Sequence, residues 1–139
     1  MKPDVSPAEE MFAADASAAM LGIELLEVGA GRAIVAMTVR DDMLNGHGTC
    51  HGGPIFSLAD TAFAVACNSH GPITVAAAAS VDFLNPAAFD DRLTATATEK
   101  FRRGRTGLYD VIVSNDAGEP IAHFRGRSHT VARSTDAST

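Results

Sequence analysis

The sequence contains no tryptophan, one tyrosine and only two cysteines among its 139 residues. Two cysteines, Cys50 and Cys67, cannot build the disulfide framework of a small exported protein. No apolar run reaches the roughly 18 residues that a membrane-spanning helix needs. The N-terminus, Met1–Asp4, has no apolar stretch behind a basic one, as a signal peptide would. We therefore expect a cytoplasmic protein that makes no contact with a membrane.

An excess of positive charge is also missing. The formal net charge is −6 at pH 7, and few aromatic side chains are present to stack on bases, so nucleic-acid binding is not expected. Residues 1–70 carry this net charge, whereas residues 71–139 are balanced. Basic side chains nevertheless gather in the second half, where they either bind a compact anionic ligand or form a solvated strand end: Lys100, Arg102, Arg103, Arg105, Arg125 and Arg127.

What the sequence does contain is the composition of one globular domain. Apolar residues make up 46% and charged residues 20% of the chain, which is ordinary for a folded domain. The length suffices for one sizeable core but not for two. We expect a single domain over residues 1–131 and a polar, disordered tail over residues 132–139.

Two segments have the pattern of helices. Ser6 and Glu9 form a capping-box pattern, and the helix that follows is expected to end at Gly22. A second helix is expected to begin at Pro54 and to end before Gly71. Its apolar residues occupy nearly every face, so the helix is expected to be buried all round.

The remaining segments alternate and are punctuated by turn residues, as antiparallel strands are. The expected strands cover residues 23–28, 32–40, 73–84, 93–101, 106–114 and 120–131, with turns at 102–105 and 115–118. We therefore predict an α+β fold, in which an antiparallel sheet of five to six strands wraps around a long buried central helix. One sheet covers only part of such a helix, so a second copy of the chain is expected to cover the rest.

A glycine-rich loop, residues 45–53, precedes the central helix. Glycine lets another molecule approach the backbone closely, and the first N–H groups of a helix lack intrahelical partners. With the helix dipole, the N–H groups of Gly52 and Gly53 can polarise a carbonyl and stabilise an oxyanion. The alternative is a plain glycine-rich turn into a capped helix.

Asp60 is the only formal charge on the central helix. A buried carboxylate without a partner is costly, so it is either satisfied by Ser57, Thr61 or a distant arginine, or it is a nucleophile or general base. It lies roughly 10 Å beyond Gly53 on the same helix. One bound carbonyl therefore cannot reach both groups of one chain, whereas two antiparallel copies of the helix would bring them together.

Other titratable groups lie in the same loop. His51, beside the oxyanion donors, is a candidate catalytic or orienting residue, although a loop histidine is often structural. His47, Cys50 and His51 suggest zinc, but no carboxylate or second cysteine lies at ligand spacing, so no metal is expected. Neither cysteine lies in a nucleophile signature.

Several segments together resemble the hotdog-fold thioesterases of the phenylacetate-degradation (PaaI) type. The resemblance rests on Leu44–His47, Cys50–Gly53, Phe56–Ala64, Val81–Leu84, Thr106–Asp110 and Phe124–His129. It implies a hotdog dimer whose sheets join edge to edge, usually paired into a tetramer. It also implies hydrolysis of aryl- or arylacetyl-CoA thioesters, such as phenylacetyl-CoA or hydroxyphenylacetyl-CoA, without metal or cofactor.

Carried over by position, the resemblance assigns roles to individual residues. Asp60 would be the nucleophile or general base, the Gly52 N–H would polarise the carbonyl, and His51 and Asn45 would orient the substrate. We further expect Gly53 and the basic cluster to bind coenzyme A, through Arg102, Arg103, Arg105, Arg125 and Arg127. Two departures remove polar groups that can position water, since some relatives have asparagine near Ala14 and serine near Ala76 or Ala77.

Two other functions remain as alternatives. A hotdog hydratase or dehydratase acting on acyl-CoA or acyl carrier protein would pair His51 with Asp60 as acid and base. A non-catalytic acyl-CoA-binding module would have no use for a lone carboxylate on an apolar helix.

Overall fold

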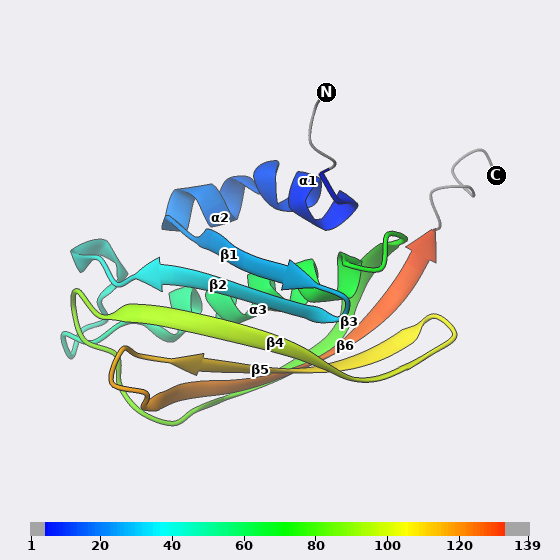
Figure 1. Ribbon diagram of the computed structural model, residues 1–139. Coiled ribbons are helices and arrows are strands. Elements are labelled where there is room, and N and C mark those ends of the chain that lie inside the picture. The colour runs from blue at the N-terminus through cyan, green and yellow to red at the C-terminus, as the bar shows by residue number, and fades with distance from the viewer. Residues whose placement is uncertain (1–4, 133–139) are drawn as a thin grey trace.

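The computed structural model describes residues 5–132, in which a six-stranded sheet curves around one long helix (Figure 1). Of the tail predicted to be disordered, residues 133–139 lie outside the described residues. The helices are α1 (Pro7–Ala13), α2 (Ala16–Leu21) and α3 (Gly52–Asn68), and a short 3-10 helix covers Asp41–Met43. The strands are β1 (Glu24–Gly29), β2 (Arg32–Thr38), β3 (Ile73–Phe83), β4 (Arg92–Arg103), β5 (Thr106–Ser114) and β6 (Pro120–Ala132).

The strands lie in the order β1-β2-β4-β5-β6-β3, and every neighbouring pair is antiparallel. The predicted α+β architecture is confirmed. β4 is longer than predicted, because its pairing with β5 continues past a bulge between Glu99 and Phe101 as far as Arg103. The turn expected over residues 102–105 is therefore shorter, and Gly104 supports it with a φ of 60°.

The N-terminal segment forms two short helices rather than the single helix predicted. Its start is as expected, since the Ser6 hydroxyl accepts a hydrogen bond from the Glu9 N–H at 3.2 Å and the Ser6 N–H donates to the Glu9 carboxylate. The break comes at Asp15, whose carboxylate accepts a backbone hydrogen bond at 2.9 Å and caps α2. Gly22 ends α2 in the left-handed conformation, as predicted.

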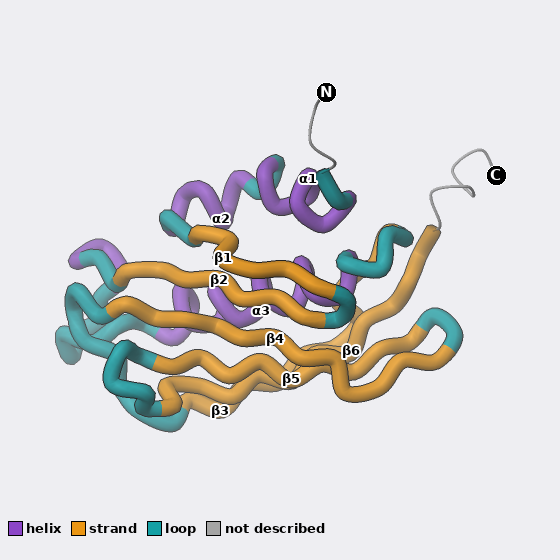
Figure 2. The backbone as a smooth tube through the Cα atoms, viewed as in Figure 1, coloured by secondary structure: helices purple, strands orange, loops and turns teal. Residues whose placement is uncertain are grey.

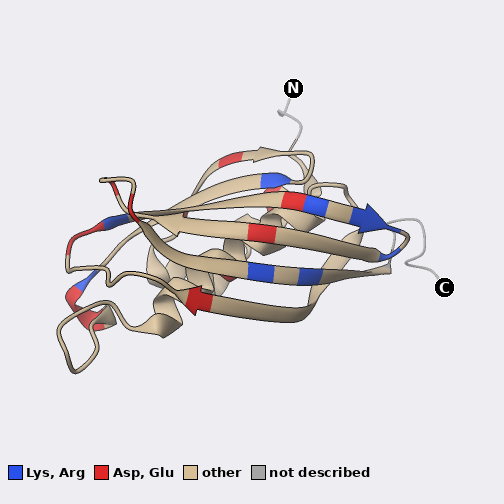
Figure 3. Ribbon diagram, turned by 90° about the horizontal axis from the view of Figure 1, so that it is seen from below, with Lys and Arg blue, Asp and Glu red and all other residues tan. Residues whose placement is uncertain are grey.

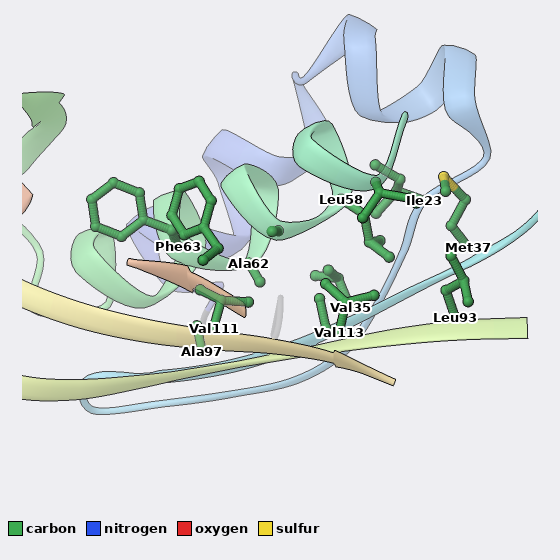
Figure 4. Close-up of a cluster of buried hydrophobic side chains, with 14 of the residues drawn as sticks. Ile23, Val35, Met37, Leu58, Ala62, Phe63, Leu93, Ala97, Val111 and Val113 are labelled. Carbon is green, nitrogen blue, oxygen red and sulfur yellow. The ribbon is translucent and has the colours of Figure 1, made fainter. Parts of the chain in front are cut away.

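The central helix α3 lies in the concave face of the sheet. It begins two residues before the predicted start at Pro54, because no N–H of the first helical turn has an intrahelical partner and a proline is tolerated there. Leu58 and Phe63 of α3 meet strand side chains such as Val111 in one apolar core (Figure 4). Each such side chain contributes about 1.5–3 kcal/mol when fully buried. No helix within residues 5–132 is long and apolar enough to cross a membrane.

One stripe of α3 remains uncovered in the single chain. Gly53, Ser57, Asp60 and Ala64 lie at helical spacing on this stripe and are only partly buried or exposed, whereas most other residues of α3 are buried. β3 is an edge strand, paired with β6 alone, and most of its side chains are exposed. The sheet and α1–α2 thus bury α3 only in part, and burial by a second copy stays a prediction.

Candidate active site

A pocket of about 690 Å³ opens at the N-terminal end of α3. The loops before α3 and after β3 lie at this end of the sheet, whereas the β4–β5 turn lies at the other end (Figure 2). The walls are mostly apolar and include two aromatic rings. The lining residues are Asn45, Cys50, His51, Gly52, Gly53, Ile55, Phe56, Phe83, Leu84, Asn85 and Pro86.

The predicted backbone donors, Gly52 and Gly53, both line this pocket. In the part of the chain that the structure describes, neither N–H donates a hydrogen bond, and His51, the N-cap residue, gives α3 no side-chain cap. The ring of Phe83 lies directly over Gly52, so that a Cβ at this position would be 2.9 Å from it. Glycine is therefore required for the ring to lie so close to the donor.

Asn45 and His51 differ in how freely their side chains can meet a ligand. The Asn45 side-chain oxygen accepts hydrogen bonds from the N–H groups of His47 and Thr49, at 2.9 and 3.2 Å. Its amide nitrogen donates to the Thr49 hydroxyl at 3.1 Å, so this side chain also holds its own loop together. The imidazole of His51 is exposed and makes no hydrogen bond within residues 5–132.

Asp60 does not line this pocket. It lies eight residues beyond Gly52, about 12 Å along α3. No hydrogen bond or ion pair among the described residues engages its carboxylate, and the Thr61 hydroxyl donates instead to the Ser57 carbonyl at 2.7 Å. Burial, together with the charge of Asp15, raises the pKa of Asp60 above its ordinary value. Within the described residues, neither Ser57, nor Thr61, nor any arginine pairs with the Asp60 carboxylate.

Asp15 is a neighbour that sequence reasoning missed. Its carboxylate caps α2 and also acts electrostatically on Asp60. The acidic residue before a run of helix formers is a local N-cap signal that was available. Its closeness to Asp60 depends on how α1 and α2 fold back over α3, which no local pattern encodes.

The five arginines expected to bind coenzyme A do not form one cluster. Arg102 and Arg105 line a second pocket, which includes residues from the C-terminal end of α3 and the β4–β5 turn. The second pocket is lined on β6 by Ser128 and Thr130. Arg125 lies nearer the start of the same strand, and its guanidinium donates a hydrogen bond to the Asp110 carboxylate at 2.9 Å. Basic positions gather at the end of β4 and in the turn that follows (Figure 3). Two further arginines are exposed and line neither pocket: Arg103 and Arg127.

Both cysteines are buried and free. Burial raises the pKa of Cys50 to about 11 and that of Cys67 to about 12. At neutral pH each is therefore a thiol rather than the thiolate that nucleophilic catalysis requires.

Comparison with known proteins identifies the family. A family model described as the thioesterase superfamily matches residues 47–122, from the glycine-rich loop into β6. The acyl-coenzyme A thioesterase PaaI of Escherichia coli (strain K12) is 49% identical over 124 residues, which cover 89% of each chain. The chain therefore belongs to the thioesterase superfamily and, within it, to the PaaI family.

Solved structures agree with this assignment. The E. coli PaaI protein from the phenylacetic acid degradation operon has a TM-score of 0.89 at 48% identity, covering 91% of both chains. A mutant of the phenylacetic acid degradation protein PaaI from Thermus thermophilus has a TM-score of 0.81 at 38% identity, covering 84% of this chain and 100% of that one. A Streptococcus mutans protein bound to acetyl CoA has a TM-score of 0.77 at 25% identity, covering 80% and 90%. The predicted hotdog fold is confirmed.

Proposed function

We propose that this protein hydrolyses aryl- or arylacetyl-CoA thioesters to the free acid and coenzyme A, as a step in the catabolism of phenylacetate or related aromatic acids. The observation that carries the proposal is an apolar pocket that joins aromatic walls to unpaired backbone donors. Phe56 and Phe83 offer flat apolar surfaces of the kind that suit an aromatic acyl group. The family relationship to the acyl-coenzyme A thioesterase of E. coli supports the same reaction.

The reaction we propose needs one carboxylate and one oxyanion site. The Gly52 N–H, with Gly53 beside it, polarises the thioester carbonyl and stabilises the negative charge that develops on its oxygen. Asp60 either attacks the carbonyl carbon itself, giving an anhydride that water then hydrolyses, or removes a proton from the attacking water. In both routes a C–O bond forms, the C–S bond breaks, and the thiolate leaves to be protonated as coenzyme A. His51 and Asn45 orient the substrate at the pocket mouth.

Two copies of the chain are needed for this chemistry. Gly52 and Asp60 of one chain lie about 12 Å apart along α3, too far for one carbonyl to meet both. The open stripe of α3 is made mostly of small residues, which would let a second α3 cross closely, and Asp60 lies within it. The free edge of β3 would pair with its counterpart to continue the sheet. The dimer would then place Gly52 of the partner subunit beside Asp60.

Two further expectations belong to this proposal. We expect two such dimers to pair into a tetramer, and we expect the protein to act in the cytoplasm. Solved relatives bound to acetyl CoA or crystallised with coenzyme A support an acyl-CoA ligand. The proposed hydrolysis uses side chains, backbone N–H groups and water alone.

Release of free thiol from a panel of acyl-CoA esters tests the proposal. We expect phenylacetyl-CoA and hydroxyphenylacetyl-CoA to have higher kcat/KM than straight-chain esters. The isosteric change Asp60→Asn removes the charge without changing the volume, so kcat should fall by roughly 10²–10⁴-fold with the fold retained. Near wild-type hydrolysis by Asp60→Asn would contradict the mechanism. A change in enoyl absorbance without thiol release would favour a hydratase.

A further inference from the structure

The two phenylalanine rings that line the pocket at the N-terminal end of α3 are held very differently. The ring of Phe56 packs edge-on against the buried ring of Phe124, with centroids 5.3 Å apart and an interplanar angle of 64°. The ring of Phe83 pairs with no aromatic ring within residues 5–132 and is 54% exposed. Phe56 is therefore a fixed wall of the pocket, whereas the side chain of Phe83 has room to change its rotamer.

The backbone around Phe83 is held in place. Phe83 ends β3, where the strand is paired with β6. The next residue, Leu84, donates its N–H to the Ile121 carbonyl at 2.8 Å, and the Asn85 side chain donates to the Pro120 carbonyl at 2.7 Å. Because these hydrogen bonds fix the backbone, movement here is confined to rotation of the Phe83 side chain.

The loop that leads to Gly52 is braced as well. The Cys50 N–H donates to the Ala87 carbonyl at 2.8 Å, which ties this loop to the segment after β3. The His51 N–H donates to the Met43 carbonyl at 2.7 Å. The two loops thus form one frame around the pocket, and the backbone of Gly52 keeps a fixed position relative to the backbone that carries the ring.

The tip of the Phe83 ring lies against Gly52. A Cβ built on Gly52 would be 2.9 Å from Cζ of the ring and 3.3 and 3.4 Å from its two Cε atoms. In a helix the Cα–Cβ bond tilts towards the N-terminus, which is also the end at which the first N–H groups face a ligand. The ring therefore borders the space in front of the Gly52 N–H, where the proposed function places the thioester carbonyl oxygen.

We infer that Phe83 is a specificity-determining residue, whose ring partly covers the Gly52 donor in the free protein and rotates away when an aromatic acyl group enters. The inference rests on the proposed function and deepens it, because it assigns the preference for aryl substrates to one movable ring. An aromatic acyl group packs against the rotated ring and against Phe56, which stabilises the open position. A short aliphatic acyl group makes no such contact, so the donor stays covered for more of the time.

The test compares two thioesters that differ only in the acyl group, phenylacetyl-CoA and acetyl-CoA. In Phe83→Ala the ratio of their kcat/KM values should fall about three- to tenfold, because the lost contact is one that only the aromatic group makes. The kcat/KM for acetyl-CoA should itself rise, since its carbonyl no longer competes with a ring for the space before the Gly52 N–H. Phe83→Leu keeps an apolar side chain and should lower the ratio too.

The matched control is Phe89→Ala. Phe89 lies in the turn after the same strand, is 57% exposed and does not line the pocket. This variant should leave both kcat/KM values unchanged. Because Phe83 is also more than half exposed, its variants should fold as this control does.

Fluorescence reports the movement of the ring directly. The chain contains no tryptophan, so Phe83→Trp places a single indole at this position. Its emission should shift when phenylacetonyl-CoA binds, a ketone analogue that cannot be hydrolysed, and should shift much less at saturation with acetonyl-CoA. Phe89→Trp should respond to neither analogue.

The possible failures are distinct. A wild type that releases thiol from no aryl- or arylacetyl-CoA would overturn the proposed function itself. Thioesterase activity with both kcat/KM values lowered equally in Phe83→Ala and Phe83→Leu would overturn this inference alone, since Phe83 would then have only a structural role. An acetyl-CoA value that does not rise in Phe83→Ala would make the ring a fixed wall, and equal emission shifts with the two analogues would separate its movement from the aryl group; both results contradict the inference.

Discussion

Two residues, Asp60 and Asp15, determine whether the candidate catalytic carboxylate is ionised. Asp60 lies on an otherwise uncharged helix and has no hydrogen-bonding partner within residues 5–132. Burial and the nearby negative charge of Asp15 act in the same direction and favour its neutral form. Asp60 must be ionised to attack a carbonyl or to accept a proton. Its raised pKa means that, at a given pH, a smaller fraction of it is ionised than of an exposed aspartate.

This arrangement predicts a pH dependence with a definite sign. Because only ionised Asp60 acts as nucleophile or base, kcat/KM should rise with pH as Asp60 loses its proton, and the raised pKa places this rise at higher pH than for an ordinary aspartate. Asp15→Asn removes the neighbouring charge and should move the rise to lower pH. Asparagine can still cap α2 through its side-chain oxygen. A pH–rate profile of kcat/KM measures the shift.

Asp116→Asn controls for the change in net charge, since this residue lies in the turn between β5 and β6, away from α3. Its pH profile should match that of the wild type. If the profile of Asp15→Asn also matches it, the two carboxylates are not coupled. If both variants move the profile equally, the effect comes from net charge alone.

At this scale the sequence was informative about Asp60, Gly52 and Gly53, because a lone charge on an apolar helix and glycines before a helix are local patterns. It could not reveal the electrostatic effect of Asp15 on Asp60 or the position of Phe83 over Gly52, because each joins segments that are distant in the chain. No sequence pattern indicated that the Asn45 side chain is engaged within its own loop.

Among the elements, the seating of α3 on the sheet determines where Gly52 and Asp60 lie. Phe63 of α3 packs against Tyr109 and Phe124, with ring centroids 5.5 and 5.7 Å apart. The same ring lies over Gly126 of β6, where an added Cβ would be 2.7 Å away. Since Phe63 is buried in a close-packed core, its ring has little room to move.

Gly126→Ala should therefore destabilise the fold by about 1–3 kcal/mol through overpacking. Denaturant unfolding measures the change in the free energy of unfolding. Gly29→Ala is the matched control, since nothing lies within 4 Å of a Cβ there, and it should change stability by less than about 0.5 kcal/mol. Equal stabilities for the two variants would show that the contact between α3 and β6 is looser than described.

The elements were predicted from the sequence with errors of identifiable cause. β5 was predicted with its observed bounds, because clear turn signals at residues 102–105 and 115–118 delimit its strand-forming residues on both sides. The break between α1 and α2 was missed, because both halves have helix-forming residues and only the cap at Asp15 separates them. The added length of β4 was missed, because a bulge interrupts the alternation that marks a strand.

In the whole molecule, the residues that the sequence predicts to bind substrate lie at two different ends of the sheet. Gly52 and Gly53 line the first pocket, whereas Arg102 and Arg105 line the second. The arginines looked like one cluster because they are close in sequence or on neighbouring strands. Alternation along each strand and the bulge in β4 turn some of them towards the second pocket and others away from it. Two independent features lead to the proposed second copy of the chain: the open stripe of α3 and the distance of about 12 Å from Gly52 to Asp60 along that helix.

Mixing two inactive variants tests the shared site. Asp60→Ala removes the carboxylate, and Gly52→Val blocks access to the donors. Phe83, the ring that a side chain at position 52 would meet, is 54% exposed and can move aside, so Gly52→Val should fold. In a mixed dimer one site carries both defects and the other carries neither. Random exchange puts about half of the dimers in the mixed form, so about a quarter of wild-type activity should return.

The control mixes Asp60→Ala with Asp60→Asn, which should restore no activity because every site then lacks the carboxylate. Subunit exchange is followed separately, by native mass spectrometry of one isotope-labelled partner. Complete exchange of Asp60→Ala with Gly52→Val and no return of thioesterase activity would rule out a site built from two chains. An active monomer would do the same, since a single chain keeps Gly52 and Asp60 about 12 Å apart on one rigid helix.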